Sequence, residues 1–255
     1  MPAKDTQMTS EKNAPAVRVS SLSKSFGKQA VLKGISLEVA QGETLSILGR
    51  SGTGKSVLLK LMIGLDKPDS GSISVYGEEV TKMPLNRLNE VRKKIGFLFQ
   101  QAALYDSLTF EENVAFPLRR HTKMSSAERD KRVRELLASV GMDGDVHKMP
   151  AEISGGMQKR AGLARALALD PEILLFDEPT AGLDPITAAE IDDLILRLHK
   201  ERHVASVVVT HDIQTARAIS DRLALMRDGE ILMEGTFEDL KKSSDPFVAK
   251  FLNGS

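Results

Sequence analysis

Residues 154–160 read Ser-Gly-Gly-Met-Gln-Lys-Arg, and they are the most informative stretch of this sequence. A serine followed by two glycines, here Gly155 and Gly156, suits the start of a helix whose backbone N–H groups face an anion. Taken alone, the stretch would fit an ordinary capped helix. Its spacing from two other motifs, described next, favours a second phosphate-holding element.

A glycine-rich loop at residues 49–56 matches the pattern G-x-x-x-x-G-K-[ST]. Glycines let backbone N–H groups converge on phosphate oxygens, and the following helix directs its positive end at the same anions. We expect Lys55 to reach the outer phosphates and the Ser56 hydroxyl to ligate Mg²⁺. With a strand predicted over 44–48 and a helix over 56–63, a chance glycine turn is a poor explanation. The predicted nucleotide contacts are Gly49, Arg50, Ser51, Gly52, Thr53, Gly54, Lys55, Ser56 and Val57.

An acidic pair, Asp177 and Glu178, ends a continuous apolar run at 172–176. Such a run suits a strand buried on both faces of a parallel sheet. Asp177 is placed to contact Mg²⁺ through water, and Glu178 to orient or deprotonate an attacking water. The alternative is a helix-capping or surface acidic pair, which the apolar run disfavours.

His211 follows a second buried run at 204–209. The motifs at Gly49, Asp177 and His211 each follow a predicted strand, and ligands of open α/β sheets bind at the carboxyl ends of the strands. We therefore expect His211 to sense a γ-phosphate, although a lone histidine after a strand is usually structural. The remaining histidines have polar or helix-surface contexts and no metal-ligand spacing: His121, His147, His199 and His203.

The segment 97–116 is rich in aromatic residues: Phe97, Phe99, Tyr105, Phe110 and Phe116. One interpretation is a partner-binding groove next to the nucleotide. The other is the core of a helical subdomain. The sequence leaves both open, and each could hold for different residues.

Composition narrows the class of protein. The chain has 255 residues, 41% of them hydrophobic and 27% charged, which is typical of a globular domain with or without a subdomain. The 35 basic and 35 acidic residues balance, so nothing points to general nucleic-acid binding. The absence of cysteine excludes disulfides and fits a reducing compartment. No apolar run approaches the about 20 residues of a membrane span, and residues 1–14 are expected to form a flexible tail without a signal-peptide core.

The alternation of strands and helices predicts a mostly parallel α/β sheet. Strands are expected over 18–39 with a turn near 27, and over 72–76 and 95–99. Helices are expected over 86–94, 111–119, 126–140, from 155 onward and over 188–201. The start at Ser126 is the least defined, because Ser126 with Arg129 makes a poor capping box.

Together these residues resemble the ATP-binding subunit of an ABC transporter from residue 17 to about residue 235. In that resemblance residues 49–56 are the Walker A loop, 153–157 the ABC signature, 173–177 the Walker B strand and 181–184 the D-loop. The remaining assignments are the Q-loop Gln100, which would also contact Mg²⁺, the catalytic Glu178, the switch His211, and Phe26 as the aromatic that stacks on adenine.

The resemblance implies an α/β P-loop NTPase fold with an ABC-type core, an antiparallel β subdomain and a helical subdomain inserted at about 100–165. The ATPase domain would cover 15–240 and a C-terminal segment 241–255. It also implies ATP and Mg²⁺ as cofactors, ATP hydrolysis coupled to transport, and a head-to-tail homodimer with nucleotide between the Lys55 loop of one copy and the Ser154 helix of the other. Transmembrane permease subunits would hold it at the cytoplasmic face of a bacterial inner membrane.

A finer resemblance points to ATPases of the Mla type, which work with MCE-domain lipid-binding proteins and a small accessory subunit. It rests on the run 154–157 followed by Lys159 and Arg160, on 98–104 with 113–119, and on 245–252. Met157 stands where the signature usually has glutamine; since Ser154 and backbone amides hold the phosphate, activity need not be lost. This resemblance implies phospholipid cargo.

Three alternatives compete with this interpretation. The cargo could instead be amino acids, metals, lipoproteins or drugs. A soluble ABC-type ATPase acting on DNA or ribosomes is disfavoured, because the interval from Ser56 to Ser154 has no room for a long heptad insertion and the chain has one cassette. A P-loop kinase or RecA-like motor would not explain the 154–160 stretch or His211.

Overall fold

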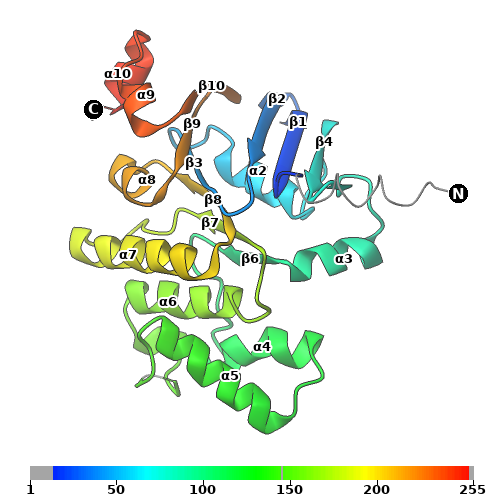
Figure 1. Ribbon diagram of the computed structural model, residues 1–255, viewed down its shortest axis with the longest axis vertical. Helices are drawn as coiled ribbons and strands as arrows, with labels where there is room; N and C mark the ends of the chain where they lie inside the picture. The colour runs from blue at the N-terminus through cyan, green and yellow to red at the C-terminus, as the bar shows by residue number, and fades with distance from the viewer. Residues whose placement is uncertain (1–13, 145, 253–255) are drawn as a thin grey trace, which may run out of the picture. The chain divides into compact units, whose positions relative to one another are not determined.

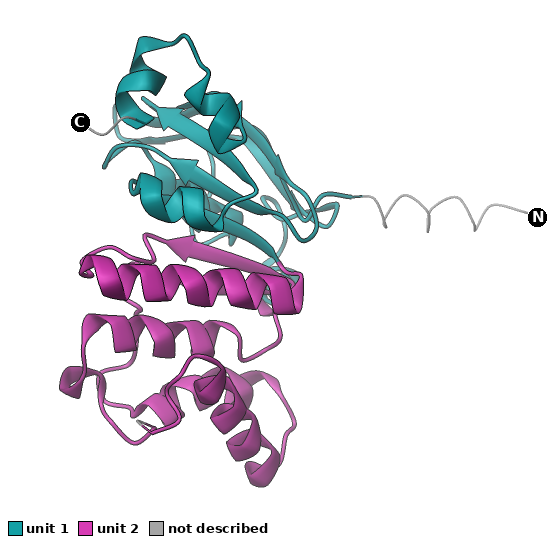
Figure 2. Ribbon diagram, turned by 60° about the vertical axis from the view of Figure 1, so that its left-hand side comes forward, with its two compact units in different colours: residues 1–91, 205–255 teal, residues 92–204 magenta. Residues whose placement is uncertain are grey.

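The computed structural model describes residues 14–144 and 146–252, so the tail expected at 1–14 lies almost wholly outside the described residues. The chain divides into two compact units, one formed by residues 1–91 with 205–255 and the other by residues 92–204 (Figure 2). Within the described part of the chain, no helix combines the length and the apolar character that crossing a membrane would require.

The first unit contains an antiparallel sheet with the strand order β2-β1-β4-β5. Figure 1 labels its strands β1, β2 and β4. Its strands are β1 Val17–Phe26, β2 Gln29–Val39, β4 Ser70–Val75 and β5 Glu78–Glu79. The turn between β1 and β2 contains Gly27 at φ +60°, a left-handed conformation that glycine adopts without steric cost. The predicted turn near residue 27 is therefore confirmed.

The first unit also contains strands β3 Thr44–Leu48, β8 Ala205–Thr210, β9 Arg222–Arg227 and β10 Glu230–Gly235. β3 pairs in parallel with both β8 and β9, and β10 pairs antiparallel with β9. Every residue of β3 and β8 is buried, as expected for strands covered on both faces. The strand predicted at 44–48 is confirmed with the same bounds.

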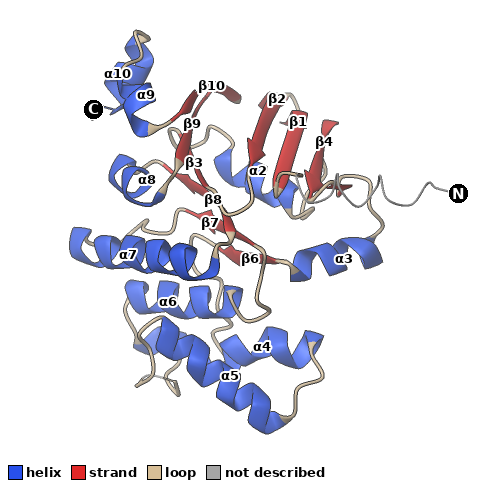
Figure 3. Cartoon of the chain, in the orientation of Figure 1, coloured by secondary structure: helices blue, strands red, loops and turns tan. Residues whose placement is uncertain are grey.

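Helices of the first unit are α2 Lys55–Met62, α8 Ile213–Ile219, α9 Phe237–Lys241 and α10 Pro246–Leu252, while α3 Leu85–Lys93 runs across the division (Figure 3). The helices α9 and α10 contribute to the core. Val248 of α10 and Leu240 of α9 are fully buried in a cluster with Leu48 of β3. The phosphate loop's own strand thus shares its apolar packing with the terminal helices.

The second unit contains the parallel pair β6 Ile95–Leu98 and β7 Ile173–Asp177. Its helices are α4 Phe110–His121, α5 Ser126–Ser139, the short η1 Pro150–Glu152, α6 Gly155–Ala166 and α7 Pro185–Arg202. α6 packs against α4, α5, α7 and β6. Phe110 is completely buried and is one of the largest side chains of this helical core. The predicted class, an α/β fold with an antiparallel β part and a helical part, is confirmed.

The start of α5 has a better cap than the sequence indicated. Ser125, one residue earlier than expected, accepts a hydrogen bond from the Glu128 N–H at 3.3 Å. Glu128 Oε2 in turn accepts from the Ser125 N–H at 2.8 Å. This reciprocal pair is a capping box, which satisfies two backbone donors of the first turn. The expected helix start at Ser126 is confirmed.

Candidate functional site

The phosphate loop leaves the buried end of β3 and ends where α2 begins at Lys55. Gly52 and Gly54 adopt φ values of +81° and +103°, which L-residues rarely adopt. A Cβ on Gly54 would also lie 2.8 Å from Leu32 Cδ2, and one on Gly49 would lie 2.6 Å from the Met226 carbonyl oxygen. Close packing at Gly49 and Gly54, and the backbone conformation at Gly52 and Gly54, therefore require glycine. These glycines are the ones expected to form the phosphate cradle.

Lys55 points its ammonium back onto the loop. Its Nζ donates to the Gly49 carbonyl at 2.7 Å and to the Arg50 carbonyl at 3.1 Å. The side chain is buried. Thr53 Oγ1 closes the loop from the other side by donating to the Arg50 carbonyl at 2.9 Å. A positive charge is therefore held at the centre of the loop, where anionic oxygens would be neutralised.

Within the first unit, the structure brings His211 to the phosphate loop. A cavity of about 340 Å³ is lined by Arg50, Ser51, His211, Ile213, Phe247, Lys250 and Phe251. The expected convergence of the loop and His211 is therefore present. Basic side chains predominate among its polar lining residues, which suits an anionic ligand.

The same cavity reveals a role for α10 that the sequence did not indicate. The Phe247 ring has the Arg227 guanidinium 4.5 Å from its centroid and the Arg50 guanidinium 5.8 Å from it. Arginine over an aromatic face is attracted by the electron-rich ring. The terminal helix thus contacts a residue of the phosphate loop directly.

In the second unit, Asp177 is the last residue of β7 and Glu178 follows it. Their exposed fractions are 6% and 8%, which contradicts the alternative of a surface acidic pair. Glu178 adopts φ +47°, in the left-handed region. Burial of two adjacent carboxylates is costly unless they have compensating partners, so this strand end is a functional candidate.

The helix predicted from residue 155 is α6, and Ser154 caps it. Ser154 Oγ accepts from the Met157 N–H at 3.3 Å. Ser154 and Gly155 are exposed, whereas Gly156 is buried. Because the cap uses the Met157 backbone rather than its side chain, methionine in place of the usual glutamine leaves this bond intact.

Lys159 lies one turn further along α6 and is almost completely buried, with 4% of its surface exposed. Its Nζ donates to the Glu178 carbonyl at 2.9 Å. Burial lowers the pKa of Lys159 to about 8, and the negative charges of Asp177 and Glu178 oppose that shift in part. In the sequence Lys159 stands beside Arg160, and a lysine within a basic pair is usually a solvated surface residue, so its burial was not predicted.

Gln100 lies in an exposed turn directly after β6, which ends at Leu98. Arg165 of α6 holds this turn by donating to the carbonyls of Ala102 at 2.6 Å and Ala103 at 2.7 Å. Both alanines have positive φ, at 56° and 48°. Hydrogen bonds from α6 therefore stabilise the backbone conformation of the turn that follows Gln100.

The aromatic residues of segment 97–116 differ in their surroundings. Phe110 belongs to the core, whereas Phe97, Phe99, Tyr105 and Phe116 line a cavity of about 420 Å³ within the second unit. Phe97 stacks on Phe99 with ring centroids 4.0 Å apart, and Tyr105 lies against Phe116 at 4.9 Å. The core interpretation is confirmed for Phe110, and the partner-binding groove stays a prediction for the four residues that line the cavity.

Phe26, the residue assigned to adenine stacking, lies at the end of β1 with 49% of its surface exposed. The Lys24 ammonium lies 5.1 Å from its ring centroid. One face of the molecule therefore offers an accessible aromatic ring at this position.

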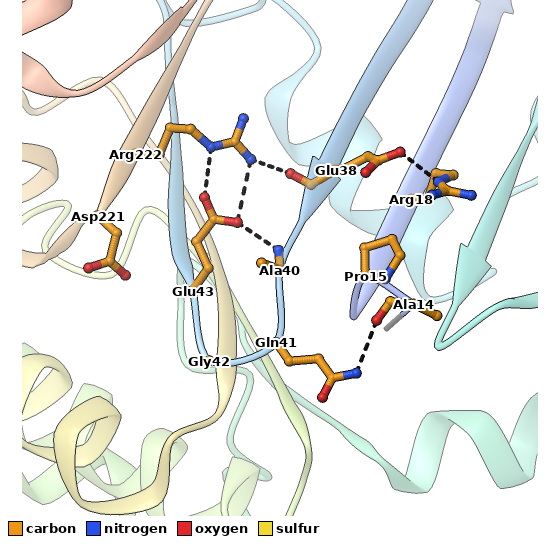
Figure 4. Close-up of a pocket in the computed structure, with 10 residues that line it drawn as sticks. All are labelled: Ala14, Pro15, Arg18, Glu38, Ala40, Gln41, Gly42, Glu43, Asp221 and Arg222. Carbon is orange, nitrogen blue, oxygen red and sulfur yellow. Dashed lines mark hydrogen bonds and ion pairs between the residues drawn. The ribbon is translucent and has the colours of Figure 1, made fainter. Parts of the chain in front are cut away.

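A larger cavity of about 810 Å³ contains none of the predicted site residues (Figure 4). Four of its charged side chains form ion pairs: Arg222 Nε lies 2.7 Å from Glu43 Oε1, and Arg18 Nε lies 2.6 Å from Glu38 Oε1. The hydrogen bond from Arg222 to Glu43 is the main cause that raises the pKa of Arg222. The first pair joins β9 to the turn before β3 and the second joins β1 to β2, so these charges connect strands.

Each unit by itself offers an oxygen donor of the kind that Mg²⁺ takes. Mg²⁺ takes oxygen ligands, commonly one or two carboxylates together with substrate phosphates. Ser56 offers a hydroxyl at the start of α2, and Asp177 offers a carboxylate at the end of β7. Across the residues that the structure describes, no group of three or more His, Cys, Asp or Glu side chains could hold a metal by itself.

A glycine cradle with a buried lysine, a buried acidic strand end and a serine-capped glycine helix define an ATP-hydrolysing cassette. Comparison with known proteins agrees, because residues 32–181 match the ABC transporter family. The chain belongs to the ABC transporter family and is its ATP-binding, ATP-hydrolysing subunit, with ATP and Mg²⁺ as cofactors.

Similar proteins cover most of the chain. The probable ribonucleotide transport ATP-binding protein mkl of Mycobacterium tuberculosis is 44% identical over 94% of this chain and 67% of its own length. The intermembrane phospholipid transport system ATP-binding protein MlaF of Haemophilus influenzae is 39% identical over 95% of this chain and 92% of its own. A dimeric post-hydrolysis ATP-binding cassette, MJ0796 bound to ADP and Pi, superimposes with a TM-score of 0.80 at 37% identity, over 86% of this chain and 98% of that one. Import ATPases named for sulfate/thiosulfate and for methionine are also similar, both at 42% identity.

Proposed function

We propose that this chain is the motor subunit of a transporter that moves phospholipid or a related lipid between bacterial membranes. The observation that carries the motor role is the start of α6: Ser154 and Gly155 cap a helix yet remain exposed. A helix start of this kind is suited to an anion brought by another molecule. Nucleotide held by a second copy of the chain would supply that anion.

The individual roles follow from residue chemistry. Lys55 and the loop N–H groups hold the phosphates, while Ser56, Asp177 and Gln100 serve Mg²⁺. Glu178 orients the attacking water, and His211 senses the γ-phosphate. The other nucleotide contacts are Gly49, Arg50, Ser51, Gly52, Thr53, Gly54, Val57, Phe26, and, from the second copy, Ser154, Gly155 and Gly156. Catalysis then consists mainly of positioning and charge stabilisation, as in other phosphoryl transfers.

A head-to-tail homodimer would clamp ATP between the Lys55 loop of one copy and the Ser154 helix of the other. Binding closes the dimer, and hydrolysis with phosphate release opens it. The similar cassette MJ0796 is dimeric in its post-hydrolysis state, which supports this arrangement.

Coupling to the membrane would use the aromatic cavity of the second unit. Tyr105 and Phe116 are 48% and 42% exposed, so they present apolar surface that a partner could cover. Transmembrane permease subunits would insert an apolar segment there. The chain would then sit on the cytoplasmic face of the inner membrane through its partners.

Lipid cargo is supported by the likeness to MlaF over most of both chains and by the MCE-associated sequence features at 154–160 and 245–252. An MCE-domain protein and a small accessory subunit would complete the complex. The relatives named for ribonucleotide, sulfate and methionine transport provide the competing cargo classes.

The test is isolation of the native complex through a tag on this chain. We expect a multi-span permease to co-purify, phospholipid to be enriched in solvent extracts of the complex, and lipid vesicles to stimulate ATP turnover. The matched control is the Lys55→Ala complex, which should assemble but show no stimulation. A permease that co-purifies with a solute-binding protein, without enriched lipid, would contradict lipid cargo while leaving the motor role intact.

A further inference from the structure

Glu178 has an unusual backbone conformation for a residue assigned to catalysis. Its φ of +47° lies in the left-handed region, where the Cβ of an L-residue is crowded by its own carbonyl. The residue is also 8% exposed, so solvent cannot satisfy its backbone freely. Surrounding groups must hold this conformation if the carboxylate is to keep one direction.

Two donors converge on the Glu178 carbonyl oxygen. Lys159 Nζ donates to it at 2.9 Å, and the Ala181 N–H donates at 3.2 Å. The Ala181 bond closes a local turn, whereas the Lys159 bond comes from a different element, α6. A charged donor makes a stronger hydrogen bond than a neutral one, so Lys159 is the stronger long-range restraint on this peptide.

Packing alone does not account for the burial of the Lys159 ammonium group. Burying an ammonium is costly unless it is paired and hydrogen-bonded. The lysine is 4% exposed and lies near the Asp177 and Glu178 carboxylates, which offset part of that cost. An apolar residue of the same length would fill the space without the penalty, which indicates that the donor itself matters.

The start of α6 is joined to the same region by a second contact. A Cβ on Gly156 would lie 2.5 Å from Thr187 Cγ2, so the first turn of α6 sits directly against the first turn of α7. α7 is capped by Asp184, whose Oδ1 accepts from the Ile186 and Thr187 N–H groups at 3.0 and 3.1 Å. The segment from Glu178 to Thr187 is thus held between two points on α6.

We propose that Lys159 is a positioning residue that fixes the backbone of Glu178, and so the direction of its carboxylate, from the helix whose Ser154 end grips phosphate. This inference rests on the proposed roles of Glu178 and Ser154. If α6 shifts when its Ser154 end binds nucleotide, the hydrogen bond from Lys159 would transmit that shift to Glu178. Phosphate binding at Ser154 would then be coupled to the positioning of the attacking water.

The experiment compares Lys159→Met, which keeps length but has no donor, with Lys159→Arg, which keeps a charged donor. Loss of a charged hydrogen bond corresponds to about a 10- to 100-fold lower kcat. We expect that fall for Lys159→Met, with KM and the Kd for a fluorescent ATP analogue changed by less than about three-fold. Lys159→Arg should recover much of kcat. Lys131→Met, on the exposed face of α5, is the matched control and should behave as wild type.

A kcat within about two-fold of wild type for Lys159→Met would overturn the proposal. So would a parallel loss of kcat, ATP binding and thermal stability that Lys159→Arg does not restore, since that pattern denotes a packing role alone. If Lys159→Met does not fold, Lys159→Leu, which also lacks a donor, takes its place with the same criteria. Because Lys55→Ala tests ATP turnover separately, failure of the proposed function and failure of this inference remain distinguishable.

The coupling between Ser154, at the start of α6, and Glu178 can be measured by a double-mutant cycle. If Lys159 carries the link, Ser154→Ala should lower kcat less in the Lys159→Met background than in wild type. An equal loss of kcat on Ser154→Ala in both backgrounds would show that Ser154 and Glu178 act independently. That result would overturn the proposed link between them, while the positioning role of Lys159 would still be decided by the kcat of Lys159→Met.

Discussion

Gly156 and Thr187 are so close that only glycine fits at the first of these positions: an added Cβ would lie 2.5 Å from Thr187 Cγ2. Thr187 cannot simply turn away, because its Oγ1 donates to Asp184 Oδ2 at 2.6 Å. The second glycine of the signature is therefore required by helix packing as well as by any approach to phosphate.

Gly156→Ala should destabilise the protein by about 1–3 kcal/mol, the usual cost of overpacking a close contact. Thr187→Ser removes the offending methyl group and keeps the hydroxyl, so the double variant Gly156→Ala/Thr187→Ser should regain most of the loss. Urea unfolding measures both. Gly144→Ala is the control, because a Cβ there would meet nothing within 4 Å. Equal destabilisation by the single and double variants would contradict the packing explanation.

Lys55→Ala should reduce ATP turnover about 10²–10³-fold, as expected when one preorganised charge is removed from the reacting phosphates. Steady-state phosphate release is the measurement. Lys60→Ala provides the control, since Lys60 lies on the same helix and is exposed. Turnover near the wild-type rate in Lys55→Ala would reject the nucleotide assignment of the loop.

Glu178→Gln should still bind ATP but hydrolyse it very slowly, because the amide cannot accept a proton from water. The chain should then accumulate as a closed dimer, visible as an ATP-dependent shift on size-exclusion chromatography. Glu172→Gln, at an exposed position before β7, is the matched control and should remain active. A Glu178→Gln protein that elutes only as monomer with ATP would show that another residue or another cycle is involved.

Phe247→Leu should lower the free energy of unfolding by about 1 kcal/mol relative to Phe247→Tyr, because only tyrosine keeps an aromatic face for the two guanidinium groups. The stronger effect is expected from Arg227, whose guanidinium lies 4.5 Å from the ring centroid. Chemical unfolding of both variants in wild-type and Arg227→Gln backgrounds isolates the contribution of the contact between Arg227 and the ring. If the difference between leucine and tyrosine is the same in both backgrounds, the ring stabilises by burial alone.

Phe116→Ala should weaken association with the permease, since it removes an exposed ring from the aromatic cavity. The measurement is the amount of permease recovered per tagged chain. Met124→Ala is the control, because Met124 is also exposed (39%) and does not line that cavity. Unchanged recovery with Phe116→Ala would move the permease contact elsewhere on the molecule.

Local features were largely predictable. The strand at 44–48, the helix that follows the glycine loop and the Ser154 cap all depend on neighbouring residues. They rest on apolar runs, positive φ at glycine and side-chain oxygen near a helix start. The capping box at Ser125 is equally local, because Glu128 follows Ser125 at the required spacing of three residues. His211 could be placed near the loop because both follow strands that pair in parallel.

Contacts between distant positions were not predictable. The hydrogen bond from Lys159 to Glu178, the contact of Gly156 with Thr187 and the approach of Phe247 to Arg50 each join different elements. In the sequence, Lys159 belongs to a basic pair that reads as solvated surface, and Phe247 belongs to a short terminal segment. Residue types and spacing along one chain specified which chemistry is present. Tertiary packing decided which groups are desolvated and which residues they contact. The reason is that burial and hydrogen-bond partners depend on elements that meet only after the chain folds.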